Sequence, residues 1–62
     1  MIHPSIKIHY LSGYKEPDLF EGAECDVSGD YVFIHQFTKD NRLKVKIPIH
    51  LSVINIIEYI YD

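Results

Sequence analysis

The middle of the chain alternates between hydrophobic and polar positions in a way that predicts a β-hairpin. Residues 31–37 are rich in aromatic and β-branched side chains, and residues 43–47 alternate strictly between apolar and basic ones. The polar residues 38–41 lie between the two runs and are expected to form the connecting loop.

The predicted hairpin sorts its side chains onto two chemically different faces, because strand residues alternate sides with a period of two. A loop at residues 38–41 places His35 opposite Lys44 and Phe33 opposite Lys46. The predicted core face carries Val32, Ile34, Leu43, Val45 and Ile47. The predicted open face carries aromatic and basic side chains, namely Tyr31, Phe33, His35, Phe37, Arg42, Lys44 and Lys46.

Two further runs extend the predicted sheet to four antiparallel strands. Residues 23–27 join the hairpin through a tight turn at Ser28 and Gly29, which sets Cys25 on the core face. Residues 5–11 alternate as well and predict the first strand.

The C-terminal residues 50–61 are compatible with a strand or a helix. Their β-branched content favours a strand. The polar residues Ser52, Asn55, Glu58 and Asp62, however, recur every three or four positions and would share one stripe on a helix. Pro48 ends the preceding strand and Ser52 is a suitable N-cap, so we predict a helix. The predicted fold is α+β, a single small domain over residues 1–62: a four-stranded antiparallel sheet with one C-terminal helix packed on one face.

The size of the chain leaves its core marginal. A domain of 62 residues buries only about 60% of its unfolded surface, and a single cysteine excludes an internal disulfide. The apolar surface of the predicted helix is wider than one sheet face requires. We therefore expect a homodimer, with Ile56, Tyr59 and Ile60 at its interface.

Charge and composition narrow the class of protein. Hydrophobic residues make up 47% of the chain and charged residues 24%, which is typical of a folded domain. The net charge of −3 disfavours strong nucleic-acid binding, although acids concentrate in residues 15–30 and bases in residues 39–46. The start of the chain lacks the pattern of a signal peptide and no apolar run is long enough to span a membrane, so we expect a cytoplasmic protein.

Catalytic and metal-binding patterns are weak in this sequence. The four histidines lack metal-ligand spacing relative to one another or to Cys25. A nucleophile–base pair of Cys25 and His35 is disfavoured, because the alternation sets the two residues on opposite sheet faces. We expect no enzyme activity, no metal and no cofactor.

The predicted open face is the most informative surface. Aromatic residues rimmed by charge are typical of protein-binding hot spots, and the apolar loop residues Leu19 and Phe20 are expected to add to them. The same aromatic and basic side chains would suit a single-stranded nucleic acid, and a dimer cleft would suit a sequestered small ligand.

In type, though in no specific motif, the chain resembles the short accessory proteins of phages and mobile elements. Such proteins commonly bind and inhibit a host protein or sequester a ligand. The leading hypothesis is a small non-enzymatic protein-interaction module that inhibits or adapts another protein.

Overall fold

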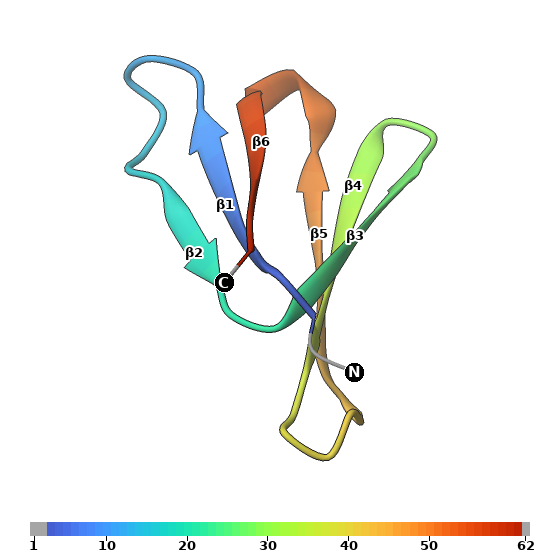
Figure 1. Ribbon diagram of the computed structural model, residues 1–62. Helices are drawn as coiled ribbons and strands as arrows, with labels where there is room; N and C mark the ends of the chain where they lie inside the picture. The colour runs from blue at the N-terminus through green and yellow to red at the C-terminus, as the bar shows by residue number, and fades with distance from the viewer. Residues whose placement is uncertain (1–2, 62) are drawn as a thin grey trace.

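The chain folds into two three-stranded antiparallel sheets (Figure 1). The computed structural model describes residues 3–61. Its strands are β1 (Ser5–Tyr10), β2 (Asp18–Phe20), β3 (Ala23–Ser28), β4 (Tyr31–Phe37), β5 (Leu43–His50) and β6 (Ile54–Ile60), and the short 3₁₀ turn η1 (Leu51–Val53) precedes β6. One sheet has the order β2-β1-β6 and the other the order β3-β4-β5.

The first change of sheet occurs between β2 and β3. Only Glu21 and Gly22 separate these strands, and Gly22 has φ 59°, a left-handed conformation that glycine adopts without strain. The carbonyl of Gly22 accepts a hydrogen bond from the Phe37 N–H at 2.9 Å, and the Ala23 N–H donates to the Pro4 carbonyl at 2.9 Å. The corner is therefore bonded to an end of each sheet.

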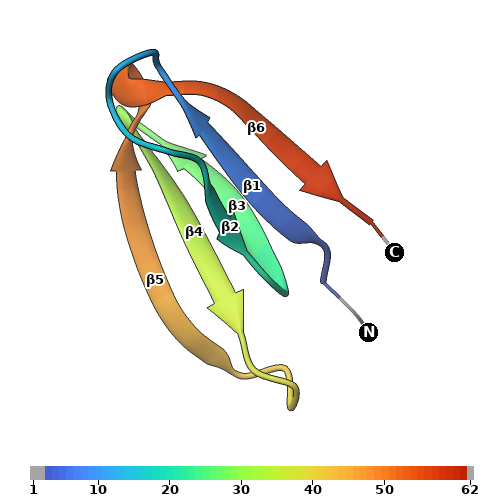
Figure 2. The same ribbon diagram turned by 90° about the vertical axis from the view of Figure 1, so that its left-hand side faces the viewer.

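The second change of sheet runs from β5 through η1 to β6. The Leu51 N–H donates to the Asp30 carbonyl at 2.8 Å, and the Leu11 N–H donates to the Val53 carbonyl at 2.9 Å. Figure 2 shows β4 and β5 on one side of the molecule and β1 and β6 on the other. The inner faces of the two sheets thus enclose one core.

The core is small and aliphatic. Its fully buried members are Ile6 and Ile8 from one sheet and Ala23, Val32 and Ile34 from the other. Half-buried side chains pack around them, namely Tyr10, Phe20, Cys25, Ile47, Ile49, Ile54 and Ile57. Burying one isoleucine contributes about 1.5–3 kcal/mol, so these few residues supply a large share of the stability of so small a domain.

The prediction of an α+β fold, a four-stranded sheet with a C-terminal helix, is wrong, because β1 lies in a different sheet from the hairpin and residues 54–60 form a strand. Strand β6 pairs with β1 along its length, from Ser5 opposite Ile60 to His9 opposite Ile56. Tyr10 then lies opposite Ile54, so that Asn55 is an extra residue in a bulge. This bulge breaks the alternation and produces the helix-like spacing of polar residues.

The predicted hairpin is confirmed, but its register differs by two residues. His35 lies opposite Lys46 and Phe33 opposite Pro48. The loop is one residue longer than expected, since the Thr38 N–H donates to the Arg42 carbonyl at 2.8 Å. A bulge at Lys44 shifts the strand pairing by one more residue. Because the total shift of the register is two residues, each of these side chains stays on its expected face of the sheet.

Two predictions for this sheet are wrong, the burial of Leu43 and the central residues of the turn between β3 and β4. Leu43, expected in the core, follows the loop and is 57% exposed. The turn from β3 to β4 has Gly29 and Asp30 at its centre rather than Ser28 and Gly29, with Ser28 opposite Tyr31. Gly29 has φ 59°, a conformation that other residues rarely adopt.

The variant Ile34→Val tests whether Ile34 contributes to the buried core. This change removes one methylene from a fully buried position and should lower the free energy of unfolding by about 0.5–1.5 kcal/mol. The control Leu43→Ala removes more apolar atoms from an exposed position and should change it by about 0.5 kcal/mol or less. Urea denaturation followed by tyrosine fluorescence measures both, and a larger loss in the control would contradict this core.

Candidate functional site

The outer face of the β3-β4-β5 sheet carries a continuous aromatic surface. Val32 and Ile34 point into the core, so the alternate residues of β4 point outward. Each faces a residue of β5 across the strand pair. We call this surface the aromatic face, and it consists of Tyr31, Phe33 and His35 on β4 with Lys46, Pro48 and His50 on β5.

Direct contacts join the members of the aromatic face. The ring of His50 meets the ring of Tyr31 edge-on, with centroids 5.0 Å apart, and the Tyr31 and Phe33 centroids are 6.2 Å apart. The Lys46 Nζ lies 4.8 Å from the centroid of the Phe33 ring. Aromatic pairs and cation–π contacts each contribute roughly 0.5–1.5 kcal/mol at such sites. These contacts limit the rotamers available to the exposed side chains before any partner binds.

The aromatic face has an acidic edge and a basic edge. On β3, Asp26 lies opposite Phe33 and Glu24 lies opposite His35. On β5, Lys46 lies on the other side of His35. The field across the face is therefore dipolar, and cations and anions are both attracted to its borders.

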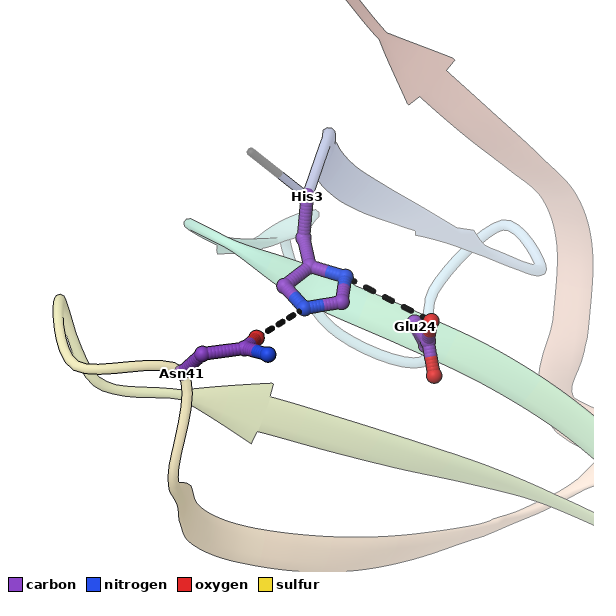
Figure 3. A network of polar contacts seen from close by, with 3 residues as sticks. All are labelled: His3, Glu24 and Asn41. Carbon is purple, nitrogen blue, oxygen red and sulfur yellow. Dashed lines mark hydrogen bonds and ion pairs between the residues drawn. The ribbon is translucent and has the colours of Figure 1, made fainter. Parts of the chain in front are cut away.

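His3 lies between Glu24 and Asn41 (Figure 3) and covers Phe37, next to the aromatic face. Its ring stacks on Phe37 with centroids 4.4 Å apart, its Nδ1 lies 3.4 Å from a Glu24 carboxylate oxygen, and its Nε2 lies 2.6 Å from Asn41 Oδ1. The segment before β1, strand β3 and the loop after β4 meet at this ring. Phe37, predicted on the open face, is thus half-buried beneath His3.

His35 has a buried ring nitrogen without a hydrogen-bond partner among residues 3–61. The atom is Nε2, and His35 lies opposite Glu24 on one neighbouring strand and opposite Lys46 on the other. His35 also lines, with Cys25 and Tyr59, a hollow of about 420 Å³. An unsatisfied buried polar atom costs about 1–3 kcal/mol, so a bound group that pairs with this nitrogen would recover that free energy.

Cys25 is a weak nucleophile in this setting. Burial raises the pKa of its thiol, with a smaller opposing effect from a hydrogen bond to Tyr59. The thiol therefore stays protonated at neutral pH, and the reactive thiolate is scarce.

A second polar cluster lies on the other sheet, where the loop between β1 and β2 is attached. The Tyr10 hydroxyl donates to Asp18 Oδ2 at 2.7 Å, and the Lys15 Nζ lies 2.9 Å from the same oxygen. The hydrogen bond from Tyr10, and then Lys15, lower the pKa of Asp18. Burial, followed by Asp18, raises the pKa of Tyr10. The cluster ties the loop to the strands beneath it.

Several residues predicted for the site lie elsewhere. Phe20 packs against the core and Leu19 lies on the outer face of the other sheet, so β2 adds nothing to the aromatic face. Arg42 belongs to the hairpin loop, and Lys44 is the extra residue of the β4–β5 bulge. The predicted interface residues are divided by strand alternation: Ile56 and Ile60 point outward from β6, and Tyr59 points inward.

Three contributors to the site were missed. Pro48 and His50 continue the alternation of Lys44 and Lys46, and extending the second run past residue 47 would have found them. His3 lies far from the hairpin in the sequence, and no local pattern indicates its contact with Phe37.

Residues 3–61 contain neither a cluster of metal-ligand side chains nor a membrane-spanning helix. No group of three or more histidine, cysteine, aspartate or glutamate side chains lies close enough together there to hold a metal ion. The same residues contain no helix long and apolar enough to cross a membrane.

Comparisons with known proteins do not place the chain in a family. No family model matches it, and neither a curated protein nor a solved structure is detectably similar.

We expect Asp18 to make the protein sensitive to acid. Since its pKa is lower in the folded chain than the unfolded value of about 3.9, its ionised form stabilises the fold above that pH. This stabilisation disappears as the pH falls through the folded pKa. The urea midpoint of the wild type should therefore fall more steeply below about pH 5 than that of Asp18→Asn. The control Asp40→Asn, in the exposed hairpin loop, should follow the wild type, and parallel curves for all three proteins would refute the role of Asp18.

Proposed function

We propose that this protein is a small non-enzymatic interaction module that inhibits or adapts another protein by docking through its aromatic face. The observation that carries this proposal is the row formed by exposed Tyr31 and His50 with half-buried Phe33, joined by ring contacts across two strands. Tyr31 remains 44% exposed. Such rings offer a large apolar area that a partner would bury.

The border of the face favours a protein as the partner. Asp26 and Glu24 lie along one side and Lys46 along the other, so the rim has both signs of charge. A protein surface can match such a rim with its own mixed charges, and this matching gives specificity and orientation.

The rigid support of the face favours binding without rearrangement. Its residues stand on two adjacent strands of one sheet, and the contacts between them hold the side chains. Less conformational entropy is then lost on association, which raises affinity for a given area. A chain of this kind can inhibit a larger protein simply by covering its functional surface.

We expect Tyr31→Ala and Phe33→Ala each to weaken the complex by about tenfold or more, the usual effect of truncating an aromatic anchor. A tagged wild type purified from its own host should retain a protein at fixed stoichiometry in native mass spectrometry. Once that partner is purified, titration calorimetry measures the affinities of the variants.

The matched control is Tyr14→Ala. Tyr14 is 56% exposed, similar to Tyr31, but lies on the loop between β1 and β2. We expect it to bind the partner as the wild type does. Equal losses for Tyr14→Ala and Tyr31→Ala, or a partner that both aromatic variants bind normally, would argue against this face.

One observation favours a second candidate, binding of single-stranded nucleic acid. Lys46 lies over the Phe33 ring, and Lys44 and Arg42 precede it along the same strand and loop. Bases could stack on the rings while these cations follow the phosphates. The carboxylates of Glu24 and Asp26 oppose this arrangement, so it ranks second.

Charge reversal separates the two candidates. If nucleic acid binds this face, Lys46→Glu should weaken the binding of a labelled oligothymidylate and reduce the slope of log affinity against log salt by about 1 or more. Lys7→Glu reverses a strand lysine on the other sheet and should have little effect. Fluorescence anisotropy measures both, and a wild type without salt-dependent binding would eliminate the second candidate.

A further inference from the structure

Strand β6 is an edge strand that a bulge protects at one end only, at Asn55, which leaves the stretch from Ile56 to Ile60 as an open edge. Within residues 3–61, the two sheets are bordered by β2, β6, β3 and β5. An edge strand presents unpaired N–H and C=O groups, and proteins usually blunt such edges with short strands, prolines or charges. Figure 2 shows β6 along the outer border of the molecule.

The other three edges of this protein carry such devices. Strand β2 has only three residues. Strand β3 carries Glu24 and Asp26, and β5 contains Pro48, with Lys46 and His50 two positions away on the same face. Strand β6 has seven residues, none of them proline or lysine, and Glu58 is its one charged residue.

The outward surface of β6 is apolar on either side of Glu58. Ile56 is 55% exposed, and Ile60 is also exposed. Both lie on the outer face of the sheet, since they are opposite His9 and Ser5 of β1. A long, β-branched, exposed edge of this kind is a template for strand addition.

We propose that β6 pairs antiparallel with β6 of a second copy around a two-fold axis at Ile57, so that the two β2-β1-β6 sheets become one six-stranded sheet. Ile57 is the midpoint of Ile54–Ile60, so this register gives the longest overlap. A two-fold axis perpendicular to the sheet keeps the side chains of residues 56–58 on their own faces, and the bulge at Asn55 ends the regular alternation beyond them.

Charge selects the same register. Centring the pair on Ile57 places Glu58 opposite Ile56 of the second copy. Centring it on Glu58 would bring two carboxylates directly opposite each other, which destabilises a strand pair. Glu58 is already compensated within its own chain, because it bonds His9 at 2.9 Å and lies opposite Lys7.

The pairing also buries apolar surface on the outer face. Diagonal neighbours in an antiparallel pair lie about 7–8 Å apart, within reach of isoleucine side chains. Ile56 therefore meets Ile56 and Ile60 of the second copy, and four isoleucines gather around the axis. A domain with five fully buried hydrophobic residues among residues 3–61 gains the reinforcement that its size requires.

A second copy fits this edge better than an extended association does. A two-fold interface is completely buried once two copies associate, so assembly stops at the dimer. The aromatic face lies on the other sheet and is left free in both copies. The dimer is thus independent of the proposed partner binding, and either can fail without the other.

Disulfide trapping tests the register in a Cys25→Ala background. Residues directly opposite each other have Cα atoms about 4.5–5.5 Å apart, within the range that a disulfide spans. Ile56→Cys mixed with Glu58→Cys should give a cross-linked dimer under mild oxidation, and either variant alone should give much less. Cross-linking of Glu58→Cys alone, or none in the mixture, would overturn the register.

Sedimentation velocity over a range of concentrations tests the dimer itself. Ile56→Asp puts a carboxylate opposite Glu58 of the second copy and should raise the dimer dissociation constant by about tenfold or more. The control Leu19→Asp changes a residue that is 53% exposed on the outer face of the same sheet, but at its opposite edge. It should leave the dimer intact.

A charge-swap variant separates pairing from general destabilisation. Adding Glu58→Lys to Ile56→Asp restores opposite charges across the pair and should recover dimerisation. A wild type that stays monomeric at every concentration, equal loss in Ile56→Asp and Leu19→Asp, or no recovery in the double variant would each overturn the proposal.

Discussion

The fold depends on the burial of Ile6 and Ile8 against Val32 and Ile34. No single three-stranded sheet of this chain could exclude water from these side chains, since each sheet has only one apolar face to offer. The chain therefore changes sheet twice, once at Gly22 and once through η1. Backbone hydrogen bonds at both corners satisfy the groups that the strand ladders leave unpaired there.

The aromatic face is a consequence of that core. Because Val32 and Ile34 must point inward, Tyr31, Phe33 and His35 must point outward from the same strand. A second sheet on the inner side leaves the outer side of β4 open, and His3 crosses to it at the Phe37 end. The fold thereby produces a supported aromatic surface and a free edge on different sheets, which allows partner binding and self-association to coexist.

The wrong helix prediction shows how a bulge imitates helical periodicity. Asn55 is an extra residue in β6, and Glu58 points outward to bond His9, so polar residues recur at intervals of three without a helix. The abundance of β-branched residues was the better guide. Polar spacing over so short a segment cannot distinguish a helix from a bulged strand, because each pattern places one polar residue every three or four positions.

The sequence by itself determined that the chain is rich in strands, where its hairpin lies, and which hairpin residues are aromatic and outward-facing, because side-chain alternation is a local property. Local pattern also misassigned Leu43 to the core, since a bulge decides its face, and it did not indicate that a distant histidine covers Phe37. Only the tertiary structure decided that residues 54–60 are a strand, that β1 is their partner, and that two sheets share the core. Those outcomes depend on contacts between segments far apart in the chain. Such contacts stabilise the fold only when both segments are already in place.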